Sequence, residues 1–402
     1  MSRCLALSLL GSTTLLAACA TPMASRAPQQ TVTVGIVALN DFHGNLEPPR
    51  QSVLASDGKG GTVAVPAGGA AWLASAVDAV RGQYANHLTV AAGDLISASQ
   101  LSSALFLDEP TIGVMNRMGL DFSAVGNHEF DRGQDELQRM QAGGCEKFTT
   151  RQPCQIEPFS GAHFGYLAAS THRTDGSTVF PATALRHFGK GRSKVTVGLI
   201  GLTLKGTPQL VSPDGIRGLT FADEAETINA LVPGLKRQGA DAIVVLIHQG
   251  GRTQGPPDPN QCNALAGEIA PILDQLDPQV DVIVSGHTHA AYVCEHPSRD
   301  AARPFLLTSA SFYGQMLTDI TLEIDPASDR VVSKRARNVI VQSEGYASSR
   351  GTVAPTALYP AFSPRADVST YVQRYVDASA ELTRRPVGHL TAPATRGEGA
   401  TA

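Results

Sequence analysis

The chain has 402 residues, which is enough for one large domain or two ordinary ones. Its 42% hydrophobic and 17% charged residues are typical of a folded globular protein and not of a disordered one. The formal net charge of −4 argues against a partner such as a nucleic-acid polymer, which is held on a broad basic surface.

The N-terminus resembles a bacterial lipoprotein signal. Arg3 supplies a positive charge, residues 5–16 form a short apolar stretch, and a Leu-Ala-Ala-Cys run ends at Cys19. We therefore expect residues 1–18 to be a signal peptide and Cys19 to carry a lipid that anchors the exported chain to a membrane, in the periplasm or cell envelope. An ordinary cleaved signal with an incidental cysteine is the alternative. Residues 19–30 are predicted to be a flexible tether.

Four further cysteines in an exported chain indicate two disulfides. Three pairings are possible, and we favour Cys145–Cys154, which closes a short loop, together with Cys262–Cys294, which braces loops near a later histidine motif. None of the four is spaced as in a zinc knuckle, which argues against a cysteine-bound zinc ion.

Apolar, β-rich runs that end in polar residues recur along the chain. The predicted strands cover residues 31–40, 87–92, 122–125, 194–203, 240–247, 280–285, 305–311 and 319–324, the last two nearer to antiparallel edges. Helical periodicity predicts helices over residues 71–81 and 221–237. Alternating strands and helices indicate an α/β layered fold, in which ligands bind at the carboxyl ends of the strands.

The composition changes after about Glu344. Residues 345–366 are rich in Ser, Ala, Pro and Gly and are predicted to be a linker. Residues 367–384 have the periodicity of one amphipathic helix, with Asp367 as its expected cap. The glycine-rich segment 57–69 lacks the Lys-Ser/Thr step of a phosphate-binding loop, so we expect a mobile loop there.

Five motifs stand in a fixed order, each at the end of a predicted strand. They are Asp41-Phe42-His43, Gly93-Asp94, Gly126-Asn127-His128-Glu129, His248, and Gly286-His287-Thr288-His289. One such motif alone is more often a helix cap or a satisfied polar group. Five at strand ends, three of them with a glycine that lets the backbone turn sharply, indicate one shared site.

These motifs are similar to those of the calcineurin-like metallophosphoesterases. LNDFHGNLEP, GNHEFD, GADAIVVLIHQGG and SGHTH resemble the bacterial 5′-nucleotidase family in particular. The resemblance covers residues 31–345 and implies a four-layer α-β-β-α sandwich, the metallophosphoesterase domain. It further implies that residues 346–402 hold a linker, a linking helix at about 367–384 and the truncated start of a C-terminal domain that is otherwise missing.

The resemblance also implies a cofactor of two divalent metal ions, which mixed nitrogen and oxygen ligands would allow to be Zn, Mn, Fe or Co. Carried over residue by residue, the ligands of the first ion are Asp41, His43 and His289, those of the second are Asn127, His248 and His287, and Asp94 bridges both.

Catalysis is assigned in the same way. His128 matches the family's catalytic histidine, Asp131 would orient it, and Asn127 and His128 would contact the substrate phosphate. A simple helix cap is the alternative role for Asp131. Glu129 is expected to bind backbone groups instead of reacting. Ala98 departs from the family, which often has glycine there.

The implied function is an exported, monomeric hydrolase of small phosphate monoesters, converting 5′-nucleotides to nucleoside and phosphate by attack of a metal-activated water. Two alternatives use the same scaffold, namely a 2′,3′-cyclic nucleotide phosphodiesterase and a sulfur-ester hydrolase. A third, non-enzymatic alternative is a binding module of the cell envelope anchored as a lipoprotein.

Overall fold

The computed structural model describes residues 31–255, 257–349, 351–386, 388–389 and 391. The predicted signal peptide, the tether and Cys19 therefore lie outside the described residues. Among the helices that the structure describes, none combines the length and apolar character needed to cross a membrane.

The first of two six-stranded sheets carries the N-terminal strand near its middle. Its strands in spatial order are β16 (Arg330–Ile340), β15 (Met316–Asp325), β1 (Val32–Leu39), β4 (His87–Ala91), β5 (Phe122–Ala124) and β6 (Gly165–Leu167). β1 pairs in parallel with β4 and antiparallel with β15, and β4, β5 and β6 continue in parallel. The carboxyl ends of β1, β4 and β5 therefore lie at one edge.

The second sheet repeats this arrangement. Its strands in spatial order are β13 (Ala291–His296), β14 (Phe305–Ala310), β12 (Val282–Ser285), β11 (Ala242–His248), β9 (Val195–Thr203) and β8 (Thr183–Phe188). β9, β11, β12 and β14 run parallel. Residues 305–311 were expected nearer to an antiparallel edge, and β14 lies next to the antiparallel edge strand β13, while β12 pairs with β14 in parallel on its other side.

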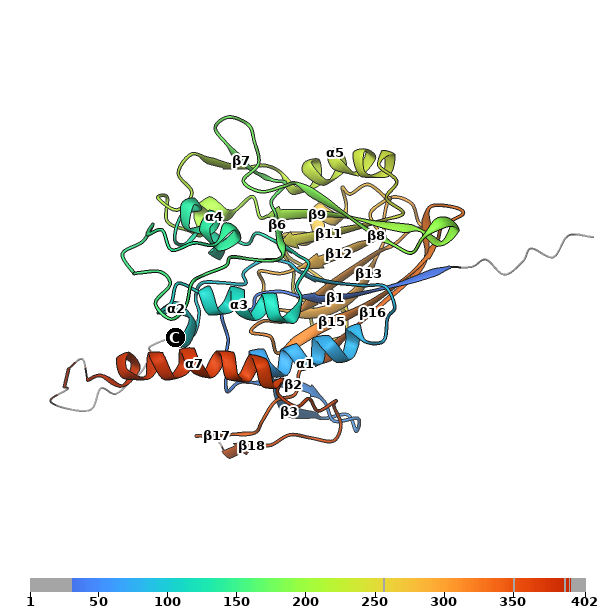
Figure 1. Cartoon of the computed structure of the whole chain (residues 1–402). Coiled ribbons are helices and arrows are strands. Elements are labelled where there is room, and N and C mark those ends of the chain that lie inside the picture. The colour runs from blue at the N-terminus through green and yellow to red at the C-terminus, as the bar shows by residue number, and fades with distance from the viewer. Residues whose placement is uncertain (1–30, 256, 350, 387, 390, 392–402) are drawn as a thin grey trace, which may run out of the picture. The chain divides into compact units, whose positions relative to one another are not determined.

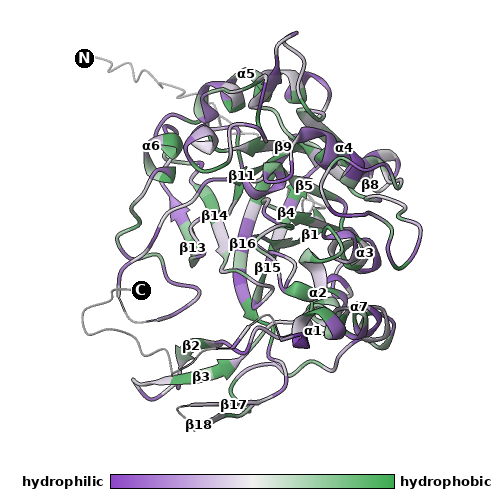
Figure 2. Cartoon of the chain, turned by 90° about the vertical axis from the view of Figure 1, so that its left-hand side faces the viewer, coloured by the Kyte–Doolittle hydropathy of each residue, from purple (hydrophilic) through white to green (hydrophobic). Residues whose placement is uncertain are grey.

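The two sheets pack face to face, and helices cover both outer faces (Figure 1). On the first sheet lie α1 (Ala70–Arg81), α3 (Glu109–Met118), α4 (Gln134–Ala142) and α7 (Ala366–Arg384); on the second lie α5 (Glu224–Arg237) and α6 (Ile269–Leu273). This confirms the predicted four-layer α-β-β-α sandwich. Hydrophobic residues fill inner strands such as β11, whereas the edge strand β16 is largely hydrophilic (Figure 2).

Shorter elements complete the chain. They are the paired strands β2 (Ser52–Ser56) and β3 (Thr62–Pro66), β7 (Thr171–Arg173) and β10 (Leu219–Phe221), and β17 (Tyr346–Ser348) and β18 (Gly351–Val353), with α2 (Leu101–Ala104) and the short helices η1 (His128–Phe130), η2 (Gly191–Ser193) and η3 (Thr207–Gln209). The segment expected as a loop at 57–69 thus includes β3 of a hairpin, and the predicted linker at 345–366 includes β17 and β18.

Helix α7 packs on the first sheet's helical layer against α1, α2 and α3. Its buried face includes Val368, Tyr371 and Tyr375, which belong to the same hydrophobic cluster as that layer. Asp367, the expected cap, lies in the first turn instead, because the helix begins one residue earlier with Arg365 at the cap position. α5 begins later than predicted, since the Asp223 side chain accepts a hydrogen bond from the Glu226 amide and caps it.

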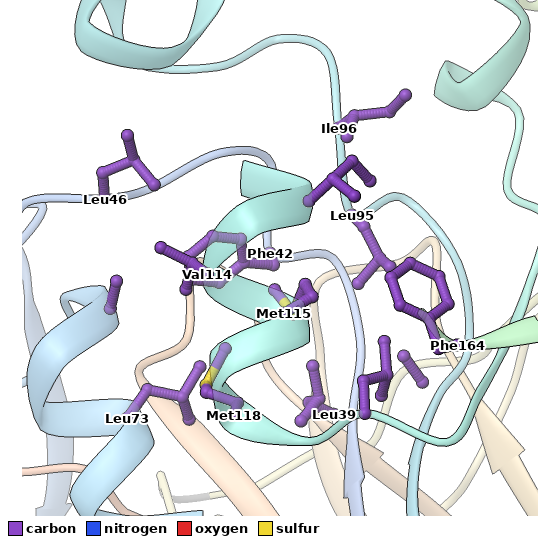
Figure 3. Close-up of a cluster of buried hydrophobic side chains, with 14 of the residues drawn as sticks. Leu39, Phe42, Leu46, Leu73, Leu95, Ile96, Val114, Met115, Met118 and Phe164 are labelled. Atoms are coloured by element: carbon purple, nitrogen blue, oxygen red, sulfur yellow. The ribbon is translucent and has the colours of Figure 1, made fainter. Parts of the chain in front are cut away.

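A buried cluster between α1, α3 and the first sheet holds the strand-end loops in place. Phe42 and Leu95 lie in it beside Met115 and Leu73 (Figure 3). Phe42 is fully buried and sits between Asp41 and His43 in the chain, so its packing fixes both polar neighbours. The core therefore determines where the first motif's side chains point.

Two disulfides and a buried ion cluster stabilise the loops. The structure joins Cys145 to Cys154 and Cys262 to Cys294, which is the pairing favoured from the sequence. Buried Arg139 of α4 forms ion pairs of 2.7 Å with Glu109 Oε1 and 2.6 Å with Glu136 Oε1. Glu109 also accepts hydrogen bonds from the Cys154 amide, so α3, α4 and the disulfide loop are joined through one guanidinium.

Replacing Arg139 by methionine is expected to lower the free energy of unfolding by about 3–5 kcal/mol, because two buried carboxylates lose their cation. Urea unfolding followed by circular dichroism measures this. Arg217→Met is the control, since Arg217 pairs with Asp214 at 80% exposure and contributes little. Equal effects of the two substitutions would contradict the account.

Candidate metal centre

The polar residues at five strand ends meet at one edge of the sandwich. Asp41 and His43 follow β1, Asp94 follows β4, Asn127 and His128 follow β5, His248 ends β11, and His287 and His289 follow β12. Each sheet therefore contributes to the same site, from strands that lie side by side within it.

Asp41, His43 and His289 form one group with the geometry to hold a metal ion. His289 Nε2 lies 3.2 Å from His43 Nε2 and 3.4 Å from Asp41 Oδ1. The Asp41 carboxylate also accepts hydrogen bonds from the His287 amide, at 3.1 and 3.0 Å. This contact joins the loop after β12 in the second sheet to the loop after β1 in the first.

Asp94 belongs to two further groups with metal-binding geometry, one with His43 and His128 and one with Asp41 and His248. Its Oδ2 lies 3.6 Å from His43 Nε2 and 3.0 Å from His248 Nε2. Its Oδ1 accepts a hydrogen bond of 2.9 Å from the His128 amide. The carboxylate is buried and lies between the imidazoles of the two sheets.

Backbone carbonyls orient two of the imidazoles. His43 Nδ1 donates to the Ser97 carbonyl at 3.0 Å, and His248 Nδ1 donates to the Ala92 carbonyl at 2.7 Å. In its neutral form with Nδ1 protonated, each ring would present the Nε2 lone pair to the site, which is the form that a metal ion requires.

Asn127 adds an oxygen without a partner. Its buried Oδ1 accepts no hydrogen bond from the residues that the structure describes. Buried polar atoms are rarely left unpaired, so this oxygen fits a bound cation. The His287 ring lies 5.3 Å from the His248 ring between centroids, outside the three compact groups.

The charges of the site favour a cation. Burial alone would lower the pKa of His248, but the neighbouring Asp94 carboxylate outweighs it and raises that pKa to about 10. Burial and the positive His248 lower the pKa of His287 to about 4, and burial lowers that of His43, so both rings are neutral as metal ligands must be.

His128 faces this centre with Asp131 behind it. The His128 ring centroid lies 5.1 Å from that of His43, and its Nδ1 lies 2.7 Å from Asp131 Oδ2. The hydrogen bond to Asp131 raises the pKa of His128 to about 9. Asp131 is the N-cap of neither neighbouring helix, since that of η1 is Asn127 and that of α4 is Gly133; it stands at the C-terminal end of η1.

Glu129 joins the loop after β4 to the loop after β5. Its buried carboxylate accepts hydrogen bonds from the amides of Asp94 (2.9 Å), Leu95 (2.8 Å) and Gly126 (2.6 Å). Burial and the Asp94 charge raise the pKa of Glu129 to about 7. The expectation that Glu129 binds backbone groups is confirmed, although the sequence did not indicate that one carboxylate holds both loops.

The backbone at the site adopts unusual conformations. Left-handed φ angles occur at Asp41 (49°), His43 (47°), Asp94 (50°), His287 (70°) and His289 (54°). Each costs on the order of 1–3 kcal/mol for a residue with a side chain, and such outliers cluster at functional sites. Gly126 has no room for a side chain, because a Cβ there would lie 2.1 Å from Asp94 Oδ1.

Three residues that support the site escaped the sequence reasoning. Asn40 donates to Asp41 Oδ2 at 2.7 Å and to the Ser311 carbonyl at 2.6 Å, linking the two sheets. Asp108 accepts a hydrogen bond of 3.1 Å from the Ser97 amide and forms an ion pair with Arg132. These contacts hold Ser97, whose carbonyl accepts the hydrogen bond from His43 Nδ1. Of these residues, only Asn40 could have been suspected from the sequence, because it directly precedes the Asp41-Phe42-His43 motif.

Comparison with known proteins identifies a family. The calcineurin-like phosphoesterase family model matches residues 35–291. The chain is 51% identical over 173 residues to an uncharacterized protein in the pqq-V 5′ region of Acinetobacter calcoaceticus, covering 42% of this chain and 83% of that protein. It is 32% identical over 316 residues to endonuclease YhcR of Bacillus subtilis, covering 78% of this chain and 24% of that enzyme.

Among solved structures, that of Haemophilus influenzae NAD nucleotidase has the same fold. The TM-score is 0.68 at 20% identity, over 90% of this chain and 63% of the other. The chain therefore spans about a quarter of that endonuclease and less than two thirds of that nucleotidase.

Ala98→Gly is expected to stabilise the protein by about 0.5–1 kcal/mol. Ala98 is exposed and has a φ of 48°, so replacing it by glycine removes the left-handed strain without losing buried contacts. The greater conformational freedom of glycine in the unfolded chain offsets part of this gain. Thermal unfolding measures the change. Ala85→Gly, at an exposed position with no positive φ, is the control and should destabilise. Destabilisation by Ala98→Gly would contradict the argument.

Proposed function

Because this chain belongs to the calcineurin-like phosphoesterases, and is therefore a metal-dependent phosphoester hydrolase, we propose that it removes phosphate from nucleotides at a centre of two divalent ions. The observation that carries this proposal is the placement of Asp94 between the imidazoles of the two sheets, with 3.6 Å to His43 Nε2 and 3.0 Å to His248 Nε2.

The residues divide into two ligand sets that share Asp94. The first set is Asp41, His43 and His289, whose ligand atoms lie within 4.8 Å of one another. The second set is Asn127, His248 and His287, of which Asn127 offers a buried oxygen that has no hydrogen-bond partner within the described chain. Asp94 would be shared by both ligand sets, and its negative charge would offset the repulsion between two bound ions. The oxygen and imidazole donors admit Zn, Mn, Fe or Co.

When bound, the two ions would supply an acidified water as nucleophile and neutralise the charge of the phosphoryl oxygens. The chain's own residues position the ester. His128, protonated through its hydrogen bond with Asp131, faces the centre and donates a proton to the leaving alkoxide. Asn127 lies beside it with a side-chain amide that contacts the phosphate, and Asp131 fixes the imidazole plane.

The names of the relatives support a nucleotide substrate. One similar protein is named an endonuclease, and another, which shares the fold, is named a NAD nucleotidase. Export is supported by the two disulfides, which persist in oxidising compartments, and by the predicted lipoprotein signal. Anchoring at Cys19 and the monomeric state stay predictions.

Removal of metal tests the centre itself. Dialysis against a chelator should abolish hydrolysis of adenosine 5′-monophosphate, and addition of Mn²⁺ or Zn²⁺ should restore it. Asp94→Asn should lower kcat/KM by about 100-fold or more, because it removes the shared charge, and should lower the bound metal below two per chain. Exposed Asp175→Asn is the control. Full activity after chelation, or metal-replete and fully active Asp94→Asn, would refute the proposal.

Asp131→Asn tests proton donation through His128. It should lower kcat by about 10–100-fold with adenosine 5′-monophosphate, with KM and metal content unchanged, because the imidazole loses its orienting charge. The loss should be smaller with p-nitrophenyl phosphate, whose leaving group needs no proton. Asp135→Asn, at an exposed position of α4, is the control. An equal loss with both substrates would count against proton donation and favour a structural role.

A further inference from the structure

Two cavities lie beside the metal centre, one on the His289 side and one on the His287 side. The first, of about 380 Å³, is bounded by the β2–β3 hairpin, the segment after His248 and the loop after β14, and includes Ala290 and Phe312. The second, of about 630 Å³, includes His287 itself. Either cavity has the volume of a small-ligand pocket. The lining residues therefore indicate which of the two suits a ligand.

Phe312 connects the first cavity to the metal centre. Its ring stacks on the His289 ring with centroids 4.9 Å apart and planes at 13°, and Tyr313 packs edge-on against it at 4.4 Å. Phe312 is only partly buried and lines the cavity. A group leaving the phosphorus on this side would meet an aromatic ring directly beside the ligands.

Polar groups without partners line the same cavity. Gln315 is 3% exposed, and its side-chain amide makes no hydrogen bond with the residues that the structure describes. The exposed Arg252 guanidinium forms no ion pair among them either. The Gln315 amide is therefore free to offer a donor and an acceptor to a ligand in this cavity.

An exposed apolar side chain completes the lining. Leu54 of β2 is 54% exposed and belongs to the same cavity, as do the buried Val53 and Met316. A flat apolar ligand in this cavity would cover this exposed side chain and so remove apolar surface from water.

The cavity on the His287 side has no comparable stacking residue. It contains no phenylalanine, tyrosine or tryptophan, and its lysine, Lys205, lies 3.3 Å from Asp223 Oδ2 in an ion pair. Its exposed apolar side chain is Leu210, and its aromatic ring is the His287 imidazole, which is assigned to the metal, so no free aromatic ring faces a planar group there.

We propose that the cavity lined by Phe312, Gln315 and Arg252 binds the aromatic base of a nucleoside leaving group. The base lies against the Phe312 ring and Leu54, the Gln315 amide bonds its polar edge, and Arg252 bonds an acceptor atom of the base. This proposal rests on the nucleotide phosphatase function proposed above and places the recognition of the base within the metal-binding domain.

The test compares kcat/KM for adenosine 5′-monophosphate with that for ribose 5-phosphate, which carries the same ester but no base. The wild type should prefer the nucleotide. Phe312→Leu and Arg252→Met should each reduce this preference, Phe312→Leu by about ten-fold, as expected for loss of base stacking on an aromatic ring. Because Arg252 is exposed, its replacement leaves the fold intact and keeps the test valid if Phe312→Leu is unstable.

Two matched variants serve as controls. Phe148→Leu removes a ring that is 42% exposed and lines neither cavity, and it should leave the preference unchanged. Lys205→Met alters the cavity on the His287 side and should also leave it unchanged. A preference that responds to Lys205→Met but not to Phe312→Leu or Arg252→Met would overturn the proposal.

A binding measurement supplies a readout apart from turnover. Adenosine binding to the metal-loaded protein, followed by calorimetry, should weaken about ten-fold in Phe312→Leu and stay unchanged in Phe148→Leu. Hydrolysis of ribose 5-phosphate and the nucleotide at equal kcat/KM, with no adenosine binding, would reject this inference alone. No hydrolysis of any phosphate monoester would reject the proposed function.

Discussion

Asp94 lies where the two sheets meet, and its carboxylate contacts groups from three other strand ends. His43 comes from the loop after β1, the His128 amide from the loop after β5, and His248 from β11 of the second sheet. Burial alone would raise the pKa of Asp94, but the charge of His248 and the hydrogen bond with it lower that pKa, so the buried carboxylate stays ionised. The positions of the imidazoles, the need for cations and the shape of the loops all follow from this one buried charge.

The position of the Asp94 carboxylate depends on contacts outside the two sheets. Glu129 binds the amides on both sides of Asp94, and Asn40 ties the end of β1 to the end of β14. The left-handed conformations of Asp41, His43 and Asp94 persist because these contacts and the packing of Phe42 outweigh their strain. The site is thus rigid before any ligand arrives, which is what electrostatic stabilisation of a transition state needs.

Much of this arrangement could be predicted from the sequence, because predicted strands that end in Asp, Asn or His indicate where metal ligands lie. The core strands and α1 were located to within a few residues, and every polar motif lies at the expected edge. The hairpin β2–β3 was missed because glycines obscured its alternation, and the packing of α7 was missed because tertiary contacts with α1, α2 and α3 leave no local signal. Phe312 and Gln315 were missed for the same reason, since only the folded chain brings Phe312 against His289 and Gln315 into the same cavity.

Whether Asp94 bridges two ions is the central claim, and anomalous diffraction tests it most directly. Crystals grown with Mn²⁺ or Zn²⁺ and measured at the absorption edge should show two peaks about 3.5–4 Å apart, one on each side of the Asp94 carboxylate. Asp41, His43 and His289 should surround one peak, and Asn127, His248 and His287 the other. A single peak, or two peaks that do not share Asp94, would contradict the account.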